Sequence, residues 1–274
     1  MDKTSRLFDK WAKTGRAEEM EKGHGTTVNK FLDKLIFDKP FTFLDIGCGN
    51  GWVVRKISQL SNCKKAIGID KSRTMIKKAK EKKNVVLIDT GTKNAIIRNI
   101  LDIGYSVVKV PWNTSIEEIL KHDPKGVVIS NGPGDPQNCP DTISTAKSLI
   151  ENNIPTLGIC LGAQILGIAG DAKTYKLKYG HRGQNKPCVN LSNNQVYVTS
   201  QNHGYCINPD SLKDSKFDLW FSNTDDKTVE GIIHENKKCI AVQFHPEASP
   251  GPYDCKFIFE ELKNIMEGGK FGEA

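Results

Sequence analysis

The sequence predicts an α/β protein with a parallel sheet, an antiparallel extension of that sheet, and a shorter strand–helix segment before it. Three observations predict this fold class. Strand-like and helix-like segments alternate from residue 84 to 170, the pattern becomes rich in strands beyond residue 188, and residues 43–51 read FLDIGCGNG. Strict alternation is typical of a parallel sheet with helices on both faces.

The predicted elements follow from apolar periodicity and from turn residues, such as Gly104 at the end of the first helix. In the alternating part we expect strands at 84–89, 106–110, 126–130 and 156–159, and helices at 92–104, 115–122, 140–153 and 160–170. Farther along we expect strands at 196–200, 219–223, 229–234 and 239–244, and a final helix near 252–266.

The composition is that of an ordinary globular chain: 274 residues, 38% hydrophobic and 26% charged. The first residues, MDKTSRLFDKWAK, lack the apolar core of a signal peptide. No apolar run approaches the roughly 18 residues that a membrane helix needs. We therefore expect a cytoplasmic protein without a membrane partner. None of the eight cysteines stands in a C-x-x-C pair, so reduced thiols and no metal site are expected.

Charge divides the chain near residue 83. Residues 1–83 carry 20 Lys/Arg and 10 Asp/Glu, whereas residues 84–274 carry 19 and 22. We therefore predict two domains with these bounds. The basic run 71–83 could contact nucleic acid, but no aromatic residues interleave with it for base stacking. A solvated helix face opposite Met75, Ile76 and Ala79 is the favoured interpretation, and no nucleic-acid partner is expected.

A candidate nucleophile lies in GICLGAQ, residues 158–164, where a strand is predicted to end and a helix to begin. G-x-C-x-G is the cysteine counterpart of the nucleophile elbow, whose sharp turn requires glycine at the flanking positions, here Gly158 and Gly162. The partial positive charge of a helix N-terminus favours the thiolate of Cys160. A buried structural cysteine is the alternative.

A thiol nucleophile needs a base and a group that orients the base. QFHPEA, residues 243–248, offers His245 and Glu247, which lie two apart and can share one side of a strand. His203 and His181 compete for the role of base, and each could instead be a structural histidine.

An oxyanion hole is the third requirement. The glycine-rich loop SNGPGDP, residues 130–136, follows a predicted strand and can direct backbone N–H groups at a developing oxyanion. An ordinary turn is the alternative, because Gly-Pro-Gly suits turns. Together the three elements predict a Cys–His–Glu site for acyl transfer.

Residues 84–266 resemble the class I glutamine amidotransferases, and among them the glutaminase domain of carbamoyl-phosphate synthase small subunits. The elbow and HPE are shared across that class. Five further blocks in order are more specific: SNGPGDP, KYGHRGQNKP (178–187), QNHGY (201–205), TVEGIIH (228–234) and QFHPEASPGPYD (243–254).

The resemblance implies that Cys160 attacks the side-chain amide of glutamine, that His245 acts as base and then acid, and that Glu247 holds His245. It implies oxyanion donors on Gly134 and Leu161. The positions matching those that hold glutamine are Gly132, Gln164, Asn202, Gly204 and Tyr205.

The implied partner is a large synthetase subunit that combines the ammonia with bicarbonate and ATP to make carbamoyl phosphate for the pyrimidine and arginine pathways. The glutaminase domain itself is expected to need no cofactor, and the chain has no G-x-x-x-x-G-K-[ST] loop for ATP. Two features depart from the family: Ala163 stands where histidine is usual, and residues 1–83 do not resemble the family's N-terminal domain, which packs on the large subunit.

FLDIGCGNG resembles motif I of methyltransferases that use S-adenosylmethionine, in a Rossmann-like sheet. The motif residues are Asp45, Gly47, Gly49 and Gly51, and Asp70 at the end of the next predicted strand is placed for ribose hydroxyls. A dinucleotide-binding fragment is the alternative. The family's sheet has about seven strands and two precede residue 84, so we predict a truncated fragment that does not bind S-adenosylmethionine usefully.

Two rival functions remain open on the sequence. Residues 1–83 could define the function as a methyltransferase remnant, or the amidotransferase fold could serve as a non-catalytic partner module. The missing strands argue against the first, and the intact Cys160, His245 and Glu247 argue against the second.

Overall fold

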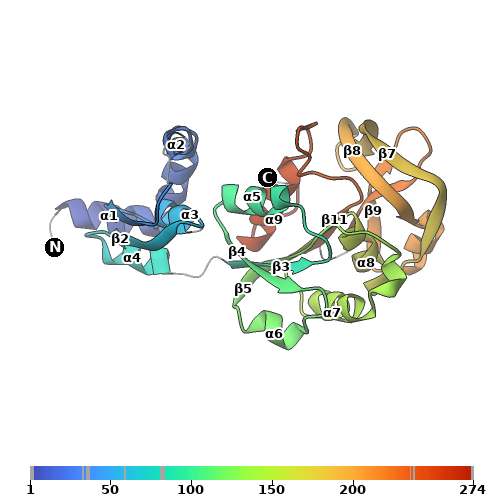
Figure 1. Cartoon of the computed structure of the whole chain (residues 1–274), viewed down its shortest axis with the longest axis horizontal. Coiled ribbons are helices and arrows are strands. Elements are labelled where there is room, and N and C mark those ends of the chain that lie inside the picture. The colour runs from blue at the N-terminus through green and yellow to red at the C-terminus, as the bar shows by residue number, and fades with distance from the viewer. Residues whose placement is uncertain are drawn as a thin grey trace. The chain divides into compact units, whose positions relative to one another are not determined.

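The computed structural model describes residues 3–32, 34, 38–58, 60–80, 84–234, 236 and 238–272. The chain divides into two compact units, an N-terminal unit, Met1–Lys82, and a C-terminal unit, Lys83–Ala274 (Figure 1). None of the described helices combines the length and the apolar character needed to cross a membrane.

The described residues of the N-terminal unit form two parallel strands and four helices around a small core. Its elements are α1 (Lys3–Lys13), α2 (Arg16–Leu32), β1 (Phe41–Ile46), α3 (Trp52–Ser58), β2 (Cys63–Ile69) and α4 (Arg73–Lys80). Ala12, Ala17 and Met75 form a buried cluster, whereas Ile46 at the end of β1 is 77% exposed. Met75 is buried and Ile76 and Ala79 are half-buried, as the amphipathic interpretation of α4 expects.

The C-terminal unit contains a nine-stranded sheet in the order β4-β3-β5-β6-β11-β10-β9-β7-β8. Its strands are β3 (Asn84–Asp89), β4 (Ser106–Pro111), β5 (Pro124–Ile129), β6 (Thr156–Ile159), β7 (Thr174–Asn190), β8 (Gln195–Ile207), β9 (Phe217–Asn223), β10 (Val229–His234) and β11 (Cys239–Val242). The first four and β11 pair in parallel, and the others pair antiparallel. The predicted parallel sheet with an antiparallel extension is confirmed.

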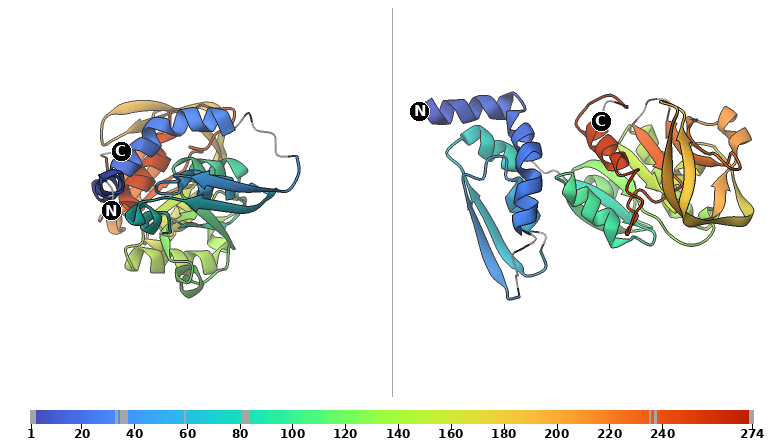
Figure 2. Two further views of the ribbon diagram at one scale, coloured as in Figure 1. Left: turned by 90° about the vertical axis from the view of Figure 1, so that its left-hand side faces the viewer. Right: turned by 90° about the horizontal axis from the view of Figure 1, so that it is seen from above.

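Helices cover both faces of the parallel part (Figures 1 and 2). Along β3, Val85 and Leu87 pack with α5 and α9 in one core, whereas Val86 and Ile88 pack with α6, α7 and α8 in the other. This alternation is the two-residue period of a strand buried on both faces. The helices are α5 (Asn94–Asp102), α6 (Ile116–Leu120), α7 (Pro140–Glu151), α8 (Leu161–Ala169) and α9 (Phe257–Met266), with the short 3₁₀ helices η1 (Pro136–Asn138) and η2 (Pro209–Asp214).

Several predicted boundaries were wrong. The strand expected at 196–200 is part of β8, which continues to Ile207. The antiparallel extension begins with β7 at Thr174 and not after residue 188. The alternation of Tyr175, Leu177 and Tyr179 with lysines was a strand signal that the prediction missed, whereas the segment GHRGQNK that follows is polar and gives no such signal. The strand expected at 239–244 ends at Val242. The last helix begins at Phe257, after the proline-containing segment 250–252.

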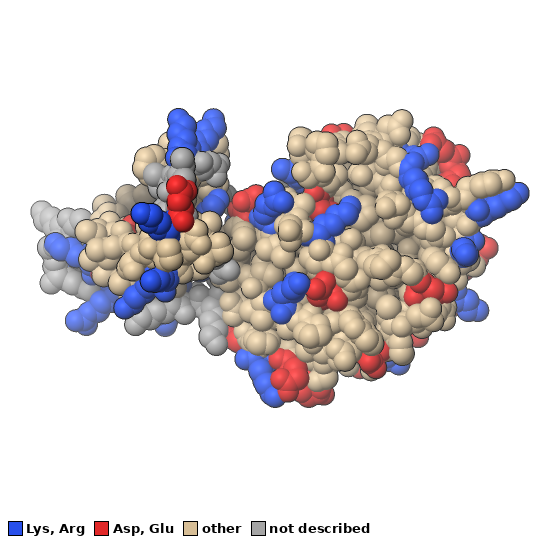
Figure 3. Space-filling model, viewed as in Figure 1, with Lys and Arg blue, Asp and Glu red and all other residues tan. Residues whose placement is uncertain are grey.

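Charged side chains of both signs are interspersed over the visible face of the C-terminal unit, as the space-filling view shows (Figure 3). Its cysteines are all free thiols.

Candidate active site

Cys160 occupies the junction between β6 and α8 with a backbone φ of 54°. This left-handed conformation is uncommon for a residue with a side chain. A Cβ atom on Gly158 would lie 2.6 Å from the carbonyl oxygen of Gly162, and one on Gly162 would overlap the carbonyl oxygen of Ile129. The turn therefore requires glycine at both flanking positions.

The backbone and side chain of Cys160 are both fixed by neighbouring elements. Its N–H donates to the carbonyl oxygen of Val242 at 2.8 Å, which ties the junction to the end of β11. Its Sγ lies 4.0 Å from the carbonyl oxygen of Asn202 on β8, and the residue is 4% exposed. The thiol is thus held at the carboxyl edge of the sheet, where open α/β sheets bind ligands.

His245 and Glu247 lie in the turn that follows β11, so the expectation that they share one side of a strand was wrong. The turn brings them together directly: Nδ1 of His245 donates to Oε1 of Glu247 at 2.8 Å. The backbone N–H of His245 donates to the carbonyl oxygen of Ser200 at 2.8 Å, and this bond fixes the turn against β8. Both side chains are buried.

Two opposing influences set the pKa of His245. Burial lowers this pKa, but hydrogen bonds with Cys160 and Glu247 and the carboxylate charge outweigh burial, so the pKa of His245 lies above its ordinary value. The imidazole is therefore suited to hold a proton opposite the thiol. A further cation, the ammonium of Lys93, lies 3.7 Å from Oε1 of Glu247.

A cavity of about 420 Å³ opens beside Cys160. Its lining includes Cys160 and His245, and it also includes all seven residues that the sequence assigned to the oxyanion or to glutamine: Gly132, Gly134, Leu161, Gln164, Asn202, Gly204 and Tyr205. Gly134 has a φ of +99°, and Leu161 is the first residue of α8. The structure therefore brings these residues together around one space.

Gln164 is held within the wall of this cavity. Its Nε2 donates to the carbonyl oxygen of Tyr205 at 2.8 Å and to Oε1 of Gln243 at 3.0 Å, and its side chain is buried. Both amide hydrogens are used inside the protein, so the group that Gln164 can offer to a ligand is its carbonyl oxygen. Ala163 lies on the face of α8 that is buried in the core, and it does not line the cavity.

The two histidines that compete with His245 have their ring nitrogens engaged elsewhere. Those of His181 contact Asp226 at 2.8 Å and Glu230 at 3.3 Å. His203 lines the cavity, but its Nδ1 contacts the carbonyl oxygen of Tyr205 at 2.9 Å, and burial lowers its pKa to about 4. His245 is the one of the three whose pKa is raised by the neighbouring Cys160 thiol.

Five residues that line the cavity were given no role by the sequence analysis: Gly91, Lys93, Asn131, Pro133 and Arg182. Gly91 and Lys93 belong to the segment DTGTK, which directly follows β3. The carboxyl ends of parallel strands meet at one edge of a sheet, so this segment after a predicted strand was a usable signal. Arg182 lies in the polar part of β7, where no strand was expected.

Other cysteines of the C-terminal unit lie in apolar surroundings. Burial raises the pKa of the Cys239 and Cys255 thiols to about 12, and it also raises those of Cys188 and Cys206. None of these four lines the cavity.

The glycine motif of the N-terminal unit forms the loop between β1 and α3. Gly47, Gly49 and Gly51 have φ values of 83°, 54° and 78°. The Asp70 carboxylate accepts from the N–H of Gly49 at 2.9 Å and from the N–H of Ser72 at 2.7 Å, so both oxygens are already engaged with the protein. Burial, and then the charge of Asp70, raises the pKa of Asp45.

This loop borders a cavity of about 640 Å³. Gly47, Gly49 and Asp70 line it together with residues of α1 and α2, and Asp45 and Gly51 do not. Its volume falls in the range of small-molecule sites. The residues present fit a small ligand at the glycine loop, whereas the described part of this unit has two strands where the resemblance implies about seven.

Comparison with known proteins gives two family matches, which overlap at residues 86–103. Residues 43–103 match the family model described as a methyltransferase domain. This match extends into β3 and α5, which belong to the nine-stranded sheet and its covering layer. Residues 86–265 match the model described as glutamine amidotransferase class I.

Curated relatives and a solved structure agree with the second match. The carbamoyl phosphate synthase small chain of Methanopyrus kandleri is 49% identical over 181 residues, and that of Pyrococcus furiosus is 47% identical over 187 residues; these cover 66% and 68% of this chain and 50% of each relative. The chain therefore spans about half the length of the curated relatives it matches.

The crystal structure of a Thermoplasma acidophilum protein assigned as part of a GMP synthase superposes with a TM-score of 0.59 at 24% identity, over 69% of this chain and 96% of that one. At this identity the likeness concerns the fold. Taken with the family match over residues 86–265, these findings show that the chain belongs to the class I glutamine amidotransferases.

Proposed function

We propose that the C-terminal unit hydrolyses the side-chain amide of glutamine through a thioester on Cys160. The observation that supports this proposal most strongly is the buried arrangement of the Cys160 thiol, His245 and Glu247 beside a cavity of about 420 Å³. A cysteine in a strained strand–helix turn, a histidine of raised pKa and a carboxylate that orients it form the set required for acyl transfer.

The reaction has two halves. The Cys160 thiolate attacks the amide carbon, the N–H groups of Gly134 and Leu161 stabilise the oxyanion, and the His245 imidazolium gives its proton to the leaving nitrogen, so that ammonia departs. In the second half, His245 takes a proton from water, the resulting hydroxide attacks the thioester, and glutamate leaves as the thiolate is restored. Glu247 stays ionised and holds His245 in position throughout.

The cavity lining supports binding roles for Gly132, Gln164, Asn202, Gly204 and Tyr205. Gly132 is a close-approach position, because a Cβ there would overlap the carbonyl oxygen of Thr90. Backbone groups of this loop and of β8 can therefore contact the glutamine main chain, whereas larger side chains at position 132 would displace the loop.

We further propose that the ammonia passes to the large subunit of a carbamoyl-phosphate synthase, which uses bicarbonate and ATP. The support is the name of the curated relatives, carbamoyl phosphate synthase small chain, at 47–49% identity. Those relatives are matched over half of their length, so this partner and the pathways it serves remain part of the proposal.

We predict that Cys160→Ser abolishes glutamine hydrolysis and leaves the fold intact, because the change is nearly isosteric. His245→Asn should lower kcat by roughly 10²–10⁴-fold, the usual contribution of general acid–base catalysis. Ammonia and glutamate release measure both effects. Cys139→Ser, at a half-buried cysteine outside the cavity, is the matched control and should keep the wild-type rate. Wild-type rates in Cys160→Ser would refute the assignment.

We predict that Glu247→Gln moves the alkaline limb of the kcat/KM profile to lower pH. The carboxylate raises the pKa of His245, so the proton that His245 donates is retained up to a higher pH in the wild type. A neutral amide removes that stabilisation, and the proton is then lost at lower pH. The measurement is kcat/KM for glutamine against pH, with Glu260→Gln on α9 as an exposed control. If the alkaline limb of the kcat/KM profile stays at the same pH in Glu247→Gln, a group other than His245 determines that limb.

We predict that ATP-dependent carbamoyl phosphate formation requires an added cognate large subunit, and that the mixture is slow with glutamine. Residues 1–83 resemble a methyltransferase segment and not the domain that packs on the large subunit. The rate of carbamoyl phosphate formation with ammonia in place of glutamine measures the activity of the large subunit alone. The rate with the Cys160→Ser variant and glutamine shows whether the ammonia comes from glutamine hydrolysis at Cys160. Ordinary rates with glutamine would show that residues 1–83 support docking.

We predict that the N-terminal unit does not bind S-adenosylmethionine at low micromolar concentration. Good sites bury roughly 70–90% of a ligand of this size, and a two-stranded sheet offers few walls for the adenine. Calorimetry on the whole chain measures binding. A low-micromolar Kd that Asp70→Ala abolishes would establish the cavity of about 640 Å³ as the ligand site and contradict this prediction.

A further inference from the structure

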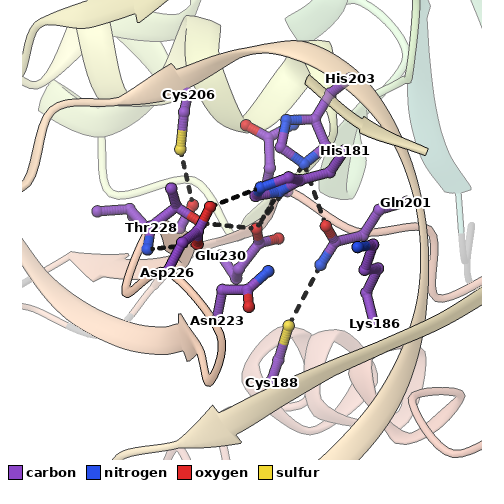
Figure 4. Close-up of polar contacts among 12 residues, drawn as sticks. His181, Lys186, Cys188, Gln201, His203, Cys206, Asn223, Asp226, Thr228 and Glu230 are labelled. Carbon is purple, nitrogen blue, oxygen red and sulfur yellow. Dashed lines mark hydrogen bonds and ion pairs between the residues drawn. The ribbon is translucent and has the colours of Figure 1, made fainter. Parts of the chain in front are cut away.

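A second group of polar side chains, which the proposed mechanism does not use, lies where β7, β8 and β10 meet (Figure 4). His181 and His203 are direct cross-strand neighbours on β7 and β8, and Glu230 lies on β10. One possible ligand atom from each of the three lies within 4.8 Å of the others. Gly180 permits this approach, since a Cβ there would lie 2.6 Å from the carbonyl oxygen of His203.

The outer nitrogen of each ring is fixed by an acceptor. Nε2 of His181 donates to Oδ2 of Asp226 at 2.8 Å, while Oδ1 of Asp226 accepts from the N–H and Oγ1 of Thr228 at 3.1 and 2.8 Å. Nδ1 of His203 donates to the carbonyl oxygen of Tyr205 at 2.9 Å. Histidines that ligate metals almost always donate their other N–H to a carboxylate or a backbone carbonyl in this way.

In the neutral rings the inner nitrogens therefore carry lone pairs, and both of these nitrogens face the same carboxylate. Nδ1 of His181 lies 3.3 Å and Nε2 of His203 lies 3.7 Å from Oε1 of Glu230. Oε1 of Gln201 also faces Nε2 of His203, at 3.4 Å. All these groups are acceptors when the rings are neutral, and protonating both rings would bring two cations together with centroids 4.9 Å apart.

The orientation of Gln201 follows from its other contacts. Thr199 Oγ1 donates to the carbonyl oxygen of Lys186 at 2.7 Å, so it receives the Nε2–H of Gln201 at 3.1 Å. Nε2 of Gln201 also donates to Sγ of Cys188 at 3.3 Å. The amide oxygen of Gln201 is thereby directed at His203, which adds a fourth acceptor to the group.

Two of the separations are those of ligands around a small cation, and the third is at most 4.8 Å. Bond lengths of about 2.0–2.1 Å in a tetrahedral site place neighbouring ligand atoms about 3.4 Å apart. The two nitrogen–oxygen separations, 3.3 and 3.7 Å, lie close to this value. Glu230 is fully buried and His203 is 5% exposed, so a cation between them would neutralise a carboxylate that has no access to water.

We propose that His181, His203 and Glu230 bind one divalent transition-metal ion of the zinc class. Two imidazoles and one carboxylate favour such an ion over magnesium or calcium, which take oxygen ligands. The fourth position faces Gln201. The ion joins the β7–β8 hairpin to β10, and that hairpin also carries Asn202, Gly204 and Tyr205 of the cavity wall.

The test is metal binding by the whole chain, in a Cys160→Ser background that removes the cavity thiol as a competing ligand. The metal is removed with a chelator, Zn²⁺ is returned, and stoichiometry and affinity are measured by elemental analysis and by competition with a chromophoric chelator. We expect one equivalent, and a Co²⁺ derivative without a sulfur-to-cobalt charge-transfer band, because the ligands are nitrogen and oxygen.

Variants separate ligation from folding. His181→Asn and Glu230→Gln should lose the bound equivalent, and Asp226→Asn should weaken affinity by about 10–100-fold, as is usual for the partner of a ligating histidine. His122→Asn, at a half-buried histidine outside the cluster, should bind as the parent does. Thermal unfolding with and without Zn²⁺ reports on a ligand variant even if its apo form is weakened: the rise in Tm should vanish.

Two results would overturn the proposal: a folded parent chain that binds no equivalent of Zn²⁺ or Co²⁺, or binding that persists unchanged in His181→Asn. A further expectation, about the kinetics of glutamine hydrolysis, rests on the proposed glutaminase function and is tested independently of metal binding. In the chain with an intact Cys160, metal removal should raise KM for glutamine more than it lowers kcat, because the ion positions wall residues and not the thiol. Metal binding without any glutaminase activity would refute the function and leave the site standing.

Discussion

The first turn of α8 lies so close to the end of β5 that no side chain fits at position 162, where a Cβ would overlap the carbonyl oxygen of Ile129. The same approach directs the N–H of Gly162 to the carbonyl oxygen of Ser130 at 3.1 Å. Helix and strand are thereby joined at the sheet edge, and Cys160 is left in its left-handed conformation. The cavity, the glycine-rich loop after β5 and the start of α8 all depend on this contact.

A second constraint is burial. Cys160, His245 and Glu247 are each at most 4% exposed, so the two ionisable partners of the thiol interact in a medium of low dielectric. Here one hydrogen bond between imidazole and carboxylate has more effect on protonation than it would at the surface. The ammonium of Lys93, itself half exposed, lies at the edge of this group and adds charge near Glu247 without burying another ion.

The sequence predicted the parts of the fold that have strong local periodicity and missed those set by tertiary pairing. The strands at 84–89 and 156–159 are continuous apolar runs and coincide with β3 and β6. The middle of β7, GHRGQNK, is polar, and it becomes part of a strand by pairing with β8 through two register shifts that no local pattern predicts. Similarly, His245 and Glu247 were paired by spacing alone, but a turn and not a strand brings them together.

The deep burial of four other thiols of the C-terminal unit has a consequence for oxidation. Peroxide reacts with thiolates, and the raised pKa values of Cys239 and Cys255 leave almost no thiolate at neutral pH. Cys160, by contrast, lines a cavity beside His245, whose pKa is raised. Mild oxidants should therefore form a sulfenic acid on Cys160, the proposed nucleophile, before they damage the core. A reductant could then restore the enzyme without refolding it, so its inactivation by peroxide would be reversible chemistry and not denaturation.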